Sequence, residues 1–172
     1  MNFTFRTADM KDLPQILHIM HTAYDSMERK DWFVIDTEDY MKEHIAAHGF
    51  TMLAIAEDGT IAGFFLIKFP GNTEENLGHL LQYSKDRLVK TVHMDMAAVH
   101  PDFRGNHLQS RMLLAAEAEL KQNHFSPCSC MATVHPENRF SLNNMLRNGY
   151  ELQLTASLYG GLPRHVLLKI LK

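Results

Sequence analysis

Apolar positions recur along the chain with two different periods, and each period predicts a type of element. Residues 2–6 alternate apolar and polar, which is typical of a strand. From residue 13 to 24 the apolar positions follow helical spacing, and the preceding Thr7-Ala8-Asp9 offers caps. A second helix is predicted from Thr37 to about His48, with Gly49 as its stop.

Strand signals follow directly after the second helix. Residues 52–56 and 61–67 are mainly apolar and flank a turn that contains Asp58-Gly59, a strong hairpin signal. These two strands should therefore be antiparallel. Residues 70–76 are typical of a loop, and residues 77–85 fit either a helix or a loop.

Strands and helices alternate in the second half of the chain. The predicted elements are a strand at 89–99, a helix at 105–123, a strand at 129–134, a helix at 138–148, and strands at 150–158 and 165–171, the last two joined by the turn-rich residues 159–163. The pattern predicts an α/β (α+β) protein with about seven strands in one mixed sheet and helices on both faces. No repeat or linker interrupts it, so we expect one domain over residues 1–172.

Composition and charge narrow the class of protein. A hydrophobic content of 45% over 172 residues is enough for the core of one domain. Against 20 Asp and Glu, 17 Lys and Arg give a net charge of -3, so the basic excess needed to bind nucleic acid is missing. No apolar run approaches the length of a spanning helix and the first residues do not resemble a leader, so we expect a cytoplasmic protein that does not bind membranes.

The two cysteines, Cys128 and Cys130, lie two residues apart on a predicted strand. Side chains at positions i and i+2 of a strand point the same way. We expect both thiols to be buried and reduced.

The stretch from Val99 to Ser110 carries the clearest chemical signal. An apolar strand breaks at Pro101, passes Gly105 and enters a long helix. Backbone N–H groups at a helix N-terminus bind anions together with the helix dipole. The sequence therefore predicts a cofactor that bears phosphate.

Two motifs within this order of elements carry a family resemblance. Val99-x-Pro101-x-x-Arg104-Gly105 lies at the exit of the fourth strand, and Asn138-x-x-Ser141 opens the last helix before Gly149-Tyr150. With these motifs the chain resembles the GNAT N-acetyltransferase superfamily over nearly its whole length. The resemblance implies the acyl-CoA N-acyltransferase fold, a mostly antiparallel sheet splayed between its fourth and fifth strands.

The resemblance also implies an activity. The expected enzyme is an acyltransferase that moves an acetyl group from acetyl-CoA to a primary amine of a small molecule, a peptide N-terminus or a lysine, by direct attack on the thioester. It would act as a monomer or homodimer. The alternative is a non-catalytic, CoA-binding regulatory module of the same fold.

Binding of acetyl-CoA would use the turn and the strand before it. In the family signature, backbone amides hold the pyrophosphate, and the matching residues here are 104–109, with His107 and Gln109 where the family usually has Gly and Gly or Ala. His107 is compatible with the turn if its φ is negative or if it accepts the left-handed conformation. The cofactor-binding residues implied by the resemblance are Ala97, Ala98, Val99, Arg104, Gly105, Asn106, His107, Leu108, Gln109, Ser110, Asn138 and Ser141.

Catalytic candidates lie on the same strand. His93 and Asp95 are two residues apart and share a face with Ala97 and Val99. Some family members place histidine bases at the corresponding positions, so His93 would take the proton of the amine while Asp95 orients the imidazole or attracts the amine. The structural alternative is a packed histidine and an aspartate that satisfies a backbone donor.

The acid that protonates the leaving thiolate has moved or is missing. Many family members use a Tyr seven residues after the Asn of the last helix, and this position holds Met145. Tyr150, Tyr159 or water can donate instead, or the thiolate can leave unassisted. We assign Tyr150 as the candidate acid.

The family usually builds its acceptor pocket from the first helices and the connector between them. Tyr24, Trp32 and Phe33 would line that pocket, although aromatic residues at such positions are more often ordinary core. Carboxylates in the connector that would suit a cationic acceptor are Glu28, Asp31 and Asp36.

No metal is expected, despite 11 histidines. His44 and His48 are four apart on a predicted helix, but the sequence has no His-Glu-x-x-His motif and no convincing third ligand. Two exposed imidazoles on an amphipathic helix explain this pair.

Overall fold

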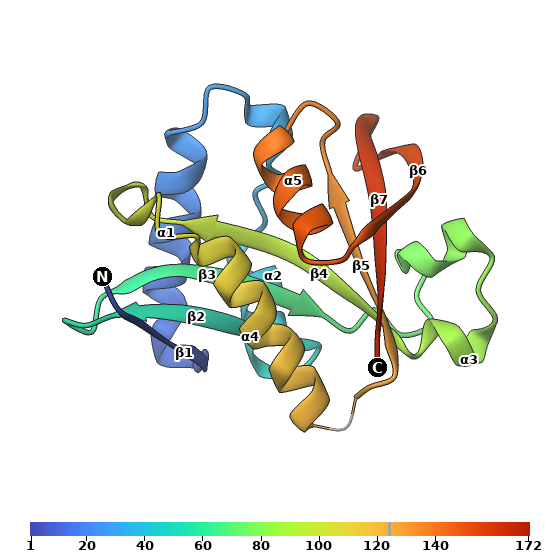
Figure 1. Cartoon of the computed structure of the whole chain (residues 1–172), viewed down its shortest axis with the longest axis horizontal. Coiled ribbons are helices and arrows are strands. Elements are labelled where there is room, and N and C mark those ends of the chain that lie inside the picture. Colours follow the sequence, from blue (N-terminus) through green and yellow to red (C-terminus); the bar gives the residue numbers. More distant parts are fainter. Residues whose placement is uncertain (124) are drawn as a thin grey trace. The chain divides into compact units, whose positions relative to one another are not determined.

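The computed structural model describes residues 1–123 and 125–172, and within them seven strands form one sheet. The strands are hydrogen-bonded in the order β1-β2-β3-β4-β5-β7-β6 (Figure 1). Their bounds are β1 Phe3–Thr7, β2 Gly49–Ala56, β3 Ile61–Lys68, β4 Thr91–Val99, β5 Cys128–Val134, β6 Glu151–Leu158 and β7 Leu162–Leu171. This sheet confirms the predicted α/β class. The strands also follow one another along the chain as predicted.

The helices also follow the predicted order. The α-helices are α1 Leu13–Asp25, α2 Glu38–Ala46, α3 Lys85–Leu88, α4 Leu108–Gln122 and α5 Arg139–Arg147. Short 3-10 helices are η1 Met10–Asp12, η2 Lys30–Trp32, η3 Leu77–Leu81 and η4 Pro101–Phe103. In the ambiguous stretch 77–85, η3 is followed by a short connection and α3 begins at Lys85. The fourth strand begins at Thr91 and not at residue 89, because Val89 is the C-cap of α3.

The sheet is mixed, as predicted. β1 pairs with β2, β2 with β3, β5 with β7, and β6 with β7, in each case antiparallel. β4 and β5 are parallel, and their register runs from Thr91↔Ser129 to His93↔Met131. The pairing therefore covers three residues of each strand, although both strands continue beyond it.

The chain forms two compact units. Met1–Lys68 and Met96–Ala116 make the first, and Phe69–Asp95 and Glu117–Lys172 make the second. Strand β4 contributes residues to both units. A single domain over residues 1–172 stays a prediction.

The core of the first unit is built by α1 against the strands. The helical spacing predicted from the sequence places Ile16 and Met20 in this core with no exposed surface, where they join Leu53 of β2 and Phe64 of β3. Burial of apolar side chains of this size stabilises a fold by about 1.5–3 kcal/mol for each residue. Packing thus fixes α1 on the sheet.

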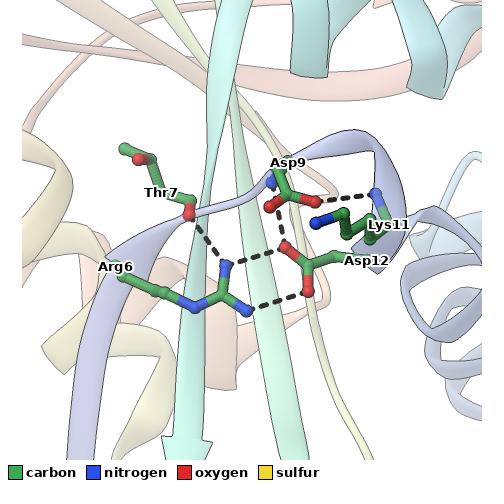
Figure 2. Close-up of polar contacts among 5 residues, drawn as sticks. All are labelled: Arg6, Thr7, Asp9, Lys11 and Asp12. Atoms are coloured by element: carbon green, nitrogen blue, oxygen red, sulfur yellow. Dashed lines mark hydrogen bonds and ion pairs between the residues drawn. The ribbon is translucent and has the colours of Figure 1, made fainter.

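The start of α1 is held by a cluster of polar contacts (Figure 2). Asp9 accepts a hydrogen bond from the Lys11 N–H at 2.7 Å, and the Asp12 carboxylate accepts one from the Asp9 N–H at 2.9 Å, which completes a capping box. The Arg6 guanidinium donates to both oxygens of Asp12 at 2.7 and 2.8 Å. One carboxylate therefore ties β1 to the entrance of α1.

The second unit centres on β5 and the β6–β7 hairpin. Met131 and Val166 are fully buried and pack with Leu77, which comes from the segment before β4. Strand β7 begins at Leu162, so the hairpin turn is shorter than the predicted 159–163 and consists of Tyr159-Gly160-Gly161, all three with positive φ. Two glycines adopt such φ values at little cost, which allows the tight turn.

Cys128 and Cys130 are free and buried on β5, as predicted. Their sulfur atoms lie 3.8 Å apart. The prediction that the imidazoles of His44 and His48 are both exposed is wrong for His44, which is buried. Its Nδ1 lies 2.7 Å from the Tyr40 carbonyl oxygen. Across residues 1–123 and 125–172, no helix is long and apolar enough to cross a membrane.

The Arg6–Asp12 pair makes stability depend on pH. The hydrogen bond from Arg6 is the main cause that lowers the pKa of Asp12 below its ordinary value near 3.8. A carboxyl with a lower pKa in the folded state stabilises the fold above its unfolded pKa, and this stabilisation disappears as pH falls through the folded pKa. We expect Asp12→Asn to lower the free energy of unfolding by about 1–2 kcal/mol at pH 7.

Urea unfolding at pH 7, 5 and 3 measures this difference. The gap between Asp12→Asn and the unmodified protein should begin to shrink below about pH 4. Asp39→Asn is the control, because the Asp39 side chain is 93% exposed, and it should change stability little at any pH. A gap of equal size at pH 7 and pH 3 would contradict the assignment.

Candidate active site

The turn after β4 places two residues in the left-handed conformation shortly before α4. Gly105 and His107 both have positive φ, 84° and 55°, and α4 starts at Leu108. The Arg111 N–H donates to the His107 carbonyl at 3.1 Å. The first N–H groups of a helix have no partner inside it, and a helix N-terminus is therefore a common place for an anion to bind.

His107 accepts the left-handed conformation, the second of the two possibilities left by the sequence. This conformation costs a residue with a Cβ roughly 1 kcal/mol, and His adopts it more readily than most residues. The turn therefore keeps the backbone course that a glycine would give. Binding of a pyrophosphate by residues 104–110 stays a prediction.

Contacts within the first unit hold the turn in place. The His100 N–H donates to the Ala62 carbonyl at 2.9 Å, and the Asn106 side-chain amide donates to the Phe103 carbonyl at 3.0 Å. The Arg104 guanidinium donates to Ser26 Oγ at 2.6 Å. The first residue of the signature thus contacts the C-cap of α1, a contact that no sequence signal indicated.

The second unit contains a small hollow, which begins where the pairing of β4 with β5 ends. The empty space around it is about 160 Å³, a figure that includes open solvent, and the hollow is too narrow to enclose a water molecule. His93 and Asp95 both line it. The other lining residues are Leu77, Met94, Met131, Ala132, Thr133 and Tyr159. Leu77 and Thr133 carried no functional signal in the sequence.

His93 is 5% exposed and is held by the backbone. Its Nε2 accepts a hydrogen bond from the Leu77 N–H at 3.0 Å. A backbone N–H is always a donor, so this contact occupies the lone pair of Nε2. The predicted role of His93 as a base would need this bond to break.

Two tyrosines were candidates for the acid, and the structure places them in different settings. Tyr159 lines the hollow, its hydroxyl lies 3.0 Å from Thr133 Oγ1, and its φ is 51°. A residue other than glycine in this strained conformation is a pointer to function when it sits at a site. The sequence left Tyr159 as an alternative to Tyr150.

Tyr150 is 2% exposed and does not line the hollow. Its hydroxyl donates to Glu117 Oε1 at 3.1 Å, and Lys169 Nζ donates to Glu117 Oε2 at 2.6 Å. Burial is the main cause that raises the pKa of Tyr150. A buried hydroxyl that is bonded to a carboxylate is poorly suited to give its proton to a substrate.

At the start of α5, Asn138 is the N-cap. Its Oδ1 accepts a hydrogen bond from the Ser141 N–H at 3.1 Å, which is the ordinary capping role considered from the sequence. Met145, at the usual position of the family's Tyr, is buried and carries no proton to give. Contacts of Asn138 and Ser141 with the cofactor stay a prediction.

The predicted acceptor residues lie at and after the end of α1, in the first unit. Lys30 Nζ lies 4.6 Å from the centre of the Tyr24 ring, and the Arg29 guanidinium lies 5.6 Å from that of Trp32. Arg29 also donates to both oxygens of Asp31 at 2.9 and 2.8 Å. Cations of the chain itself thus contact these aromatic faces and this carboxylate, and Phe33 packs against the core.

Among the residues that the structure describes, no group of three or more His, Cys, Asp or Glu side chains could hold a metal ion. The polar side chains that line the hollow are one carboxylate, one imidazole and two hydroxyl groups. These groups can attract a cation, accept a proton and donate one.

Comparison with known proteins adds to this geometry. The model of the acetyltransferase (GNAT) family matches residues 14–150. Among curated protein sequences, none matches the chain.

Solved structures share the fold. A GNAT-family acetyltransferase from Listeria monocytogenes 4b F2365 has 18% identity and a TM-score of 0.73, with 98% of this chain and 95% of that chain covered. The ribosomal-protein-S18-alanine N-acetyltransferase from Escherichia coli has 13% identity and a TM-score of 0.72, with 99% and 94% covered. The yncA protein of Salmonella typhimurium, solved with its cofactor acetyl-CoA, has 16% identity and a TM-score of 0.69, with 100% and 95% covered.

The buried contacts of Glu117 predict a large effect of removing Lys169. The Glu117 side chain is 7% exposed, so Lys169→Met leaves a buried carboxylate whose charge has lost its cation. We expect the free energy of unfolding to fall by about 3 kcal/mol, and the double variant Glu117→Gln with Lys169→Met to recover part of it. Urea unfolding at pH 7 measures both.

Lys42→Met is the matched control. Lys42 and Glu38 form an equally short ion pair of 2.7 Å on the exposed surface of α2. This pair is screened by water, so its loss should be barely measurable. Equal losses of stability for Lys169→Met and Lys42→Met would show that burial of Glu117 does not matter.

Proposed function

Because the chain belongs to the acetyltransferase (GNAT) family and is an acetyl-CoA-dependent acetyltransferase, we propose that its acceptor is a primary amine that binds beside Asp95. The observation that carries the proposal is the hollow, which brings the Asp95 carboxylate together with the hydroxyl groups of Tyr159 and Thr133. An amine arrives mainly as an ammonium ion, which a carboxylate attracts. The amine would belong to a small molecule, a peptide N-terminus or a lysine.

Strand β4 and the turn after it supply the groups that would hold acetyl-CoA, whose thioester provides an activated acetyl group. The first-turn N–H groups of α4 fit a pyrophosphate because no helical partner satisfies them. Backbone groups of Ala97 and Val99 would pair with the pantetheine arm, and an N–H there would stabilise negative charge on the thioester oxygen. Asp95 and Val99 lie on one continuous strand, about 13 Å apart at 3.3 Å for each residue.

The reaction needs two proton transfers, and we assign each of them to a different residue of the hollow. The amine must lose a proton before or during its attack, and Asp95, directly or through water, would accept it. The leaving sulfur gains a proton, and the Tyr159 hydroxyl, hydrogen-bonded to Thr133, would donate it. Tyr150 is not the proposed acid, because its hydroxyl donates a hydrogen bond to Glu117.

Release of free thiol from acetyl-CoA tests the activity across a panel of polyamines, amino acids, aminoglycosides and peptides. We expect at least one amine to raise thiol release above the rate of hydrolysis, with mass spectrometry showing one acetyl group on its nitrogen. Tight binding of CoA with no acceleration by any amine would overturn the proposed acceptor class.

Variants of the hollow test the assigned residues. Asp95→Asn should lower kcat by about 100-fold and Tyr159→Phe by about tenfold, because general acid–base groups contribute in this range. The dissociation constant of acetyl-CoA, measured by calorimetry, should change little in either variant. Asp39→Asn, whose side chain is 93% exposed on α2, is the matched control. Unchanged kcat in both hollow variants would remove these assignments.

A further inference from the structure

The segment between β3 and β4 is organised around Asn76, which is 1% exposed. The side-chain amide of Asn76 donates to the Gly71 carbonyl at 2.6 Å and to the Leu88 carbonyl at 3.0 Å. Its side-chain oxygen accepts from the Gly78 N–H at 2.8 Å. One buried side chain thus ties together the beginning, middle and end of residues 71–88.

This segment contacts the hollow through Leu77, the residue after Asn76. The Leu77 side chain is buried against Met131 and Val166 and forms part of the lining. The Leu77 N–H donates to His93 Nε2 on β4, 16 residues away in sequence. Segment 71–88 is therefore held to β4 by a buried hydrogen bond and packs through the Leu77 side chain against β5 and β7.

We infer that His93 is a positioning residue, which holds segment 71–88 as a wall of the acceptor hollow and is not the proton acceptor of the reaction. Leu77 and Asp95 both line the hollow, so His93 acts on the acceptor through Leu77. The role of the hollow in this inference rests on the proposed function. The hydrogen bond between Leu77 and His93 does not depend on it.

The chemistry of the hydrogen bond between the Leu77 N–H and His93 Nε2 supports a positioning role for His93. The Leu77 amide can only donate, so the Nε2 lone pair is directed at its proton and a neutral imidazole carries its own proton on Nδ1. A proton taken up at Nε2 would face the Leu77 N–H and break the bond that seats the wall. Asp95 is half-buried and lines the same hollow.

The first test needs no variant. In the 15N spectrum of the histidine-labelled protein, without acetyl-CoA, neutral His93 should show a protonated Nδ1 and an unprotonated Nε2, with a through-bond coupling from Nε2 to the Leu77 amide. A proton on Nε2 of the neutral ring would overturn the inference.

The second test separates anchoring from proton transfer. His93→Phe removes the acceptor, so amide hydrogen exchange over residues 71–88 should rise about tenfold, the effect of losing one buried hydrogen bond. Glutamine offers a side-chain oxygen that can accept from Leu77 but cannot take up a proton. His93→Gln should therefore retain slower exchange than His93→Phe and most of the kcat of the unmodified protein.

His79→Gln is the matched control, because His79 is an exposed histidine of the same segment whose Nε2 lies 3.1 Å from the Thr73 carbonyl oxygen. It should leave exchange at Leu77 unchanged. If His93→Gln and His93→Phe lose kcat equally while exchange over residues 71–88 stays at the level of the unmodified protein, His93 transfers protons and the inference is wrong. Exchange is measured without acetyl-CoA, so its outcome is independent of whether an amine is the acceptor.

Discussion

The parallel pairing of β4 with β5 covers three residues of each strand, and the candidate site depends on where it stops. Up to His93 and Met131 the two backbones satisfy each other. Directly beyond, Asp95 of β4 and Thr133 of β5 line the hollow. Strand β4 then continues to Val99 and delivers the chain into the turn that begins α4. One strand therefore carries the carboxylate that we propose for the acceptor and leads into the turn that is predicted to bind phosphate.

Polar side chains in this protein divide into those that hold the fold and those that are available for chemistry, and residue type does not separate them. Tyr150 and Tyr159 have the same hydroxyl, but the first is buried on Glu117 while the second is 51% exposed and lines the hollow. His93, two residues before Asp95 on β4, likewise accepts a buried hydrogen bond from the Leu77 N–H. A group whose lone pair or proton already serves a buried partner costs free energy to release, which is why the proposed reactive roles fall to other residues.

Much of the fold could be predicted from the sequence because its signals are local. Helical spacing over residues 13–24 predicted α1, the Asp58-Gly59 turn predicted the β2–β3 hairpin, and Asn138 and Gly149 marked the two ends of α5. The errors also have physical reasons. His44 lies on the predicted helix, but packing against the core buries it, which the period of one helix does not reveal.

The sequence by itself determined the order of strands and helices along the chain and the turn at Gly105 before α4. It also determined the two candidates on β4, the imidazole of His93 and the carboxylate of Asp95. Each of these follows from spacing over a few residues. Only the tertiary structure decided that His107 is left-handed, that Tyr159 rather than Tyr150 lines the hollow, and that His93 accepts from Leu77. Glu117 and Tyr150 are 33 residues apart, and His93 and Leu77 are 16 apart. Contacts over such separations are selected by how whole elements pack, and no local pattern of residues encodes them.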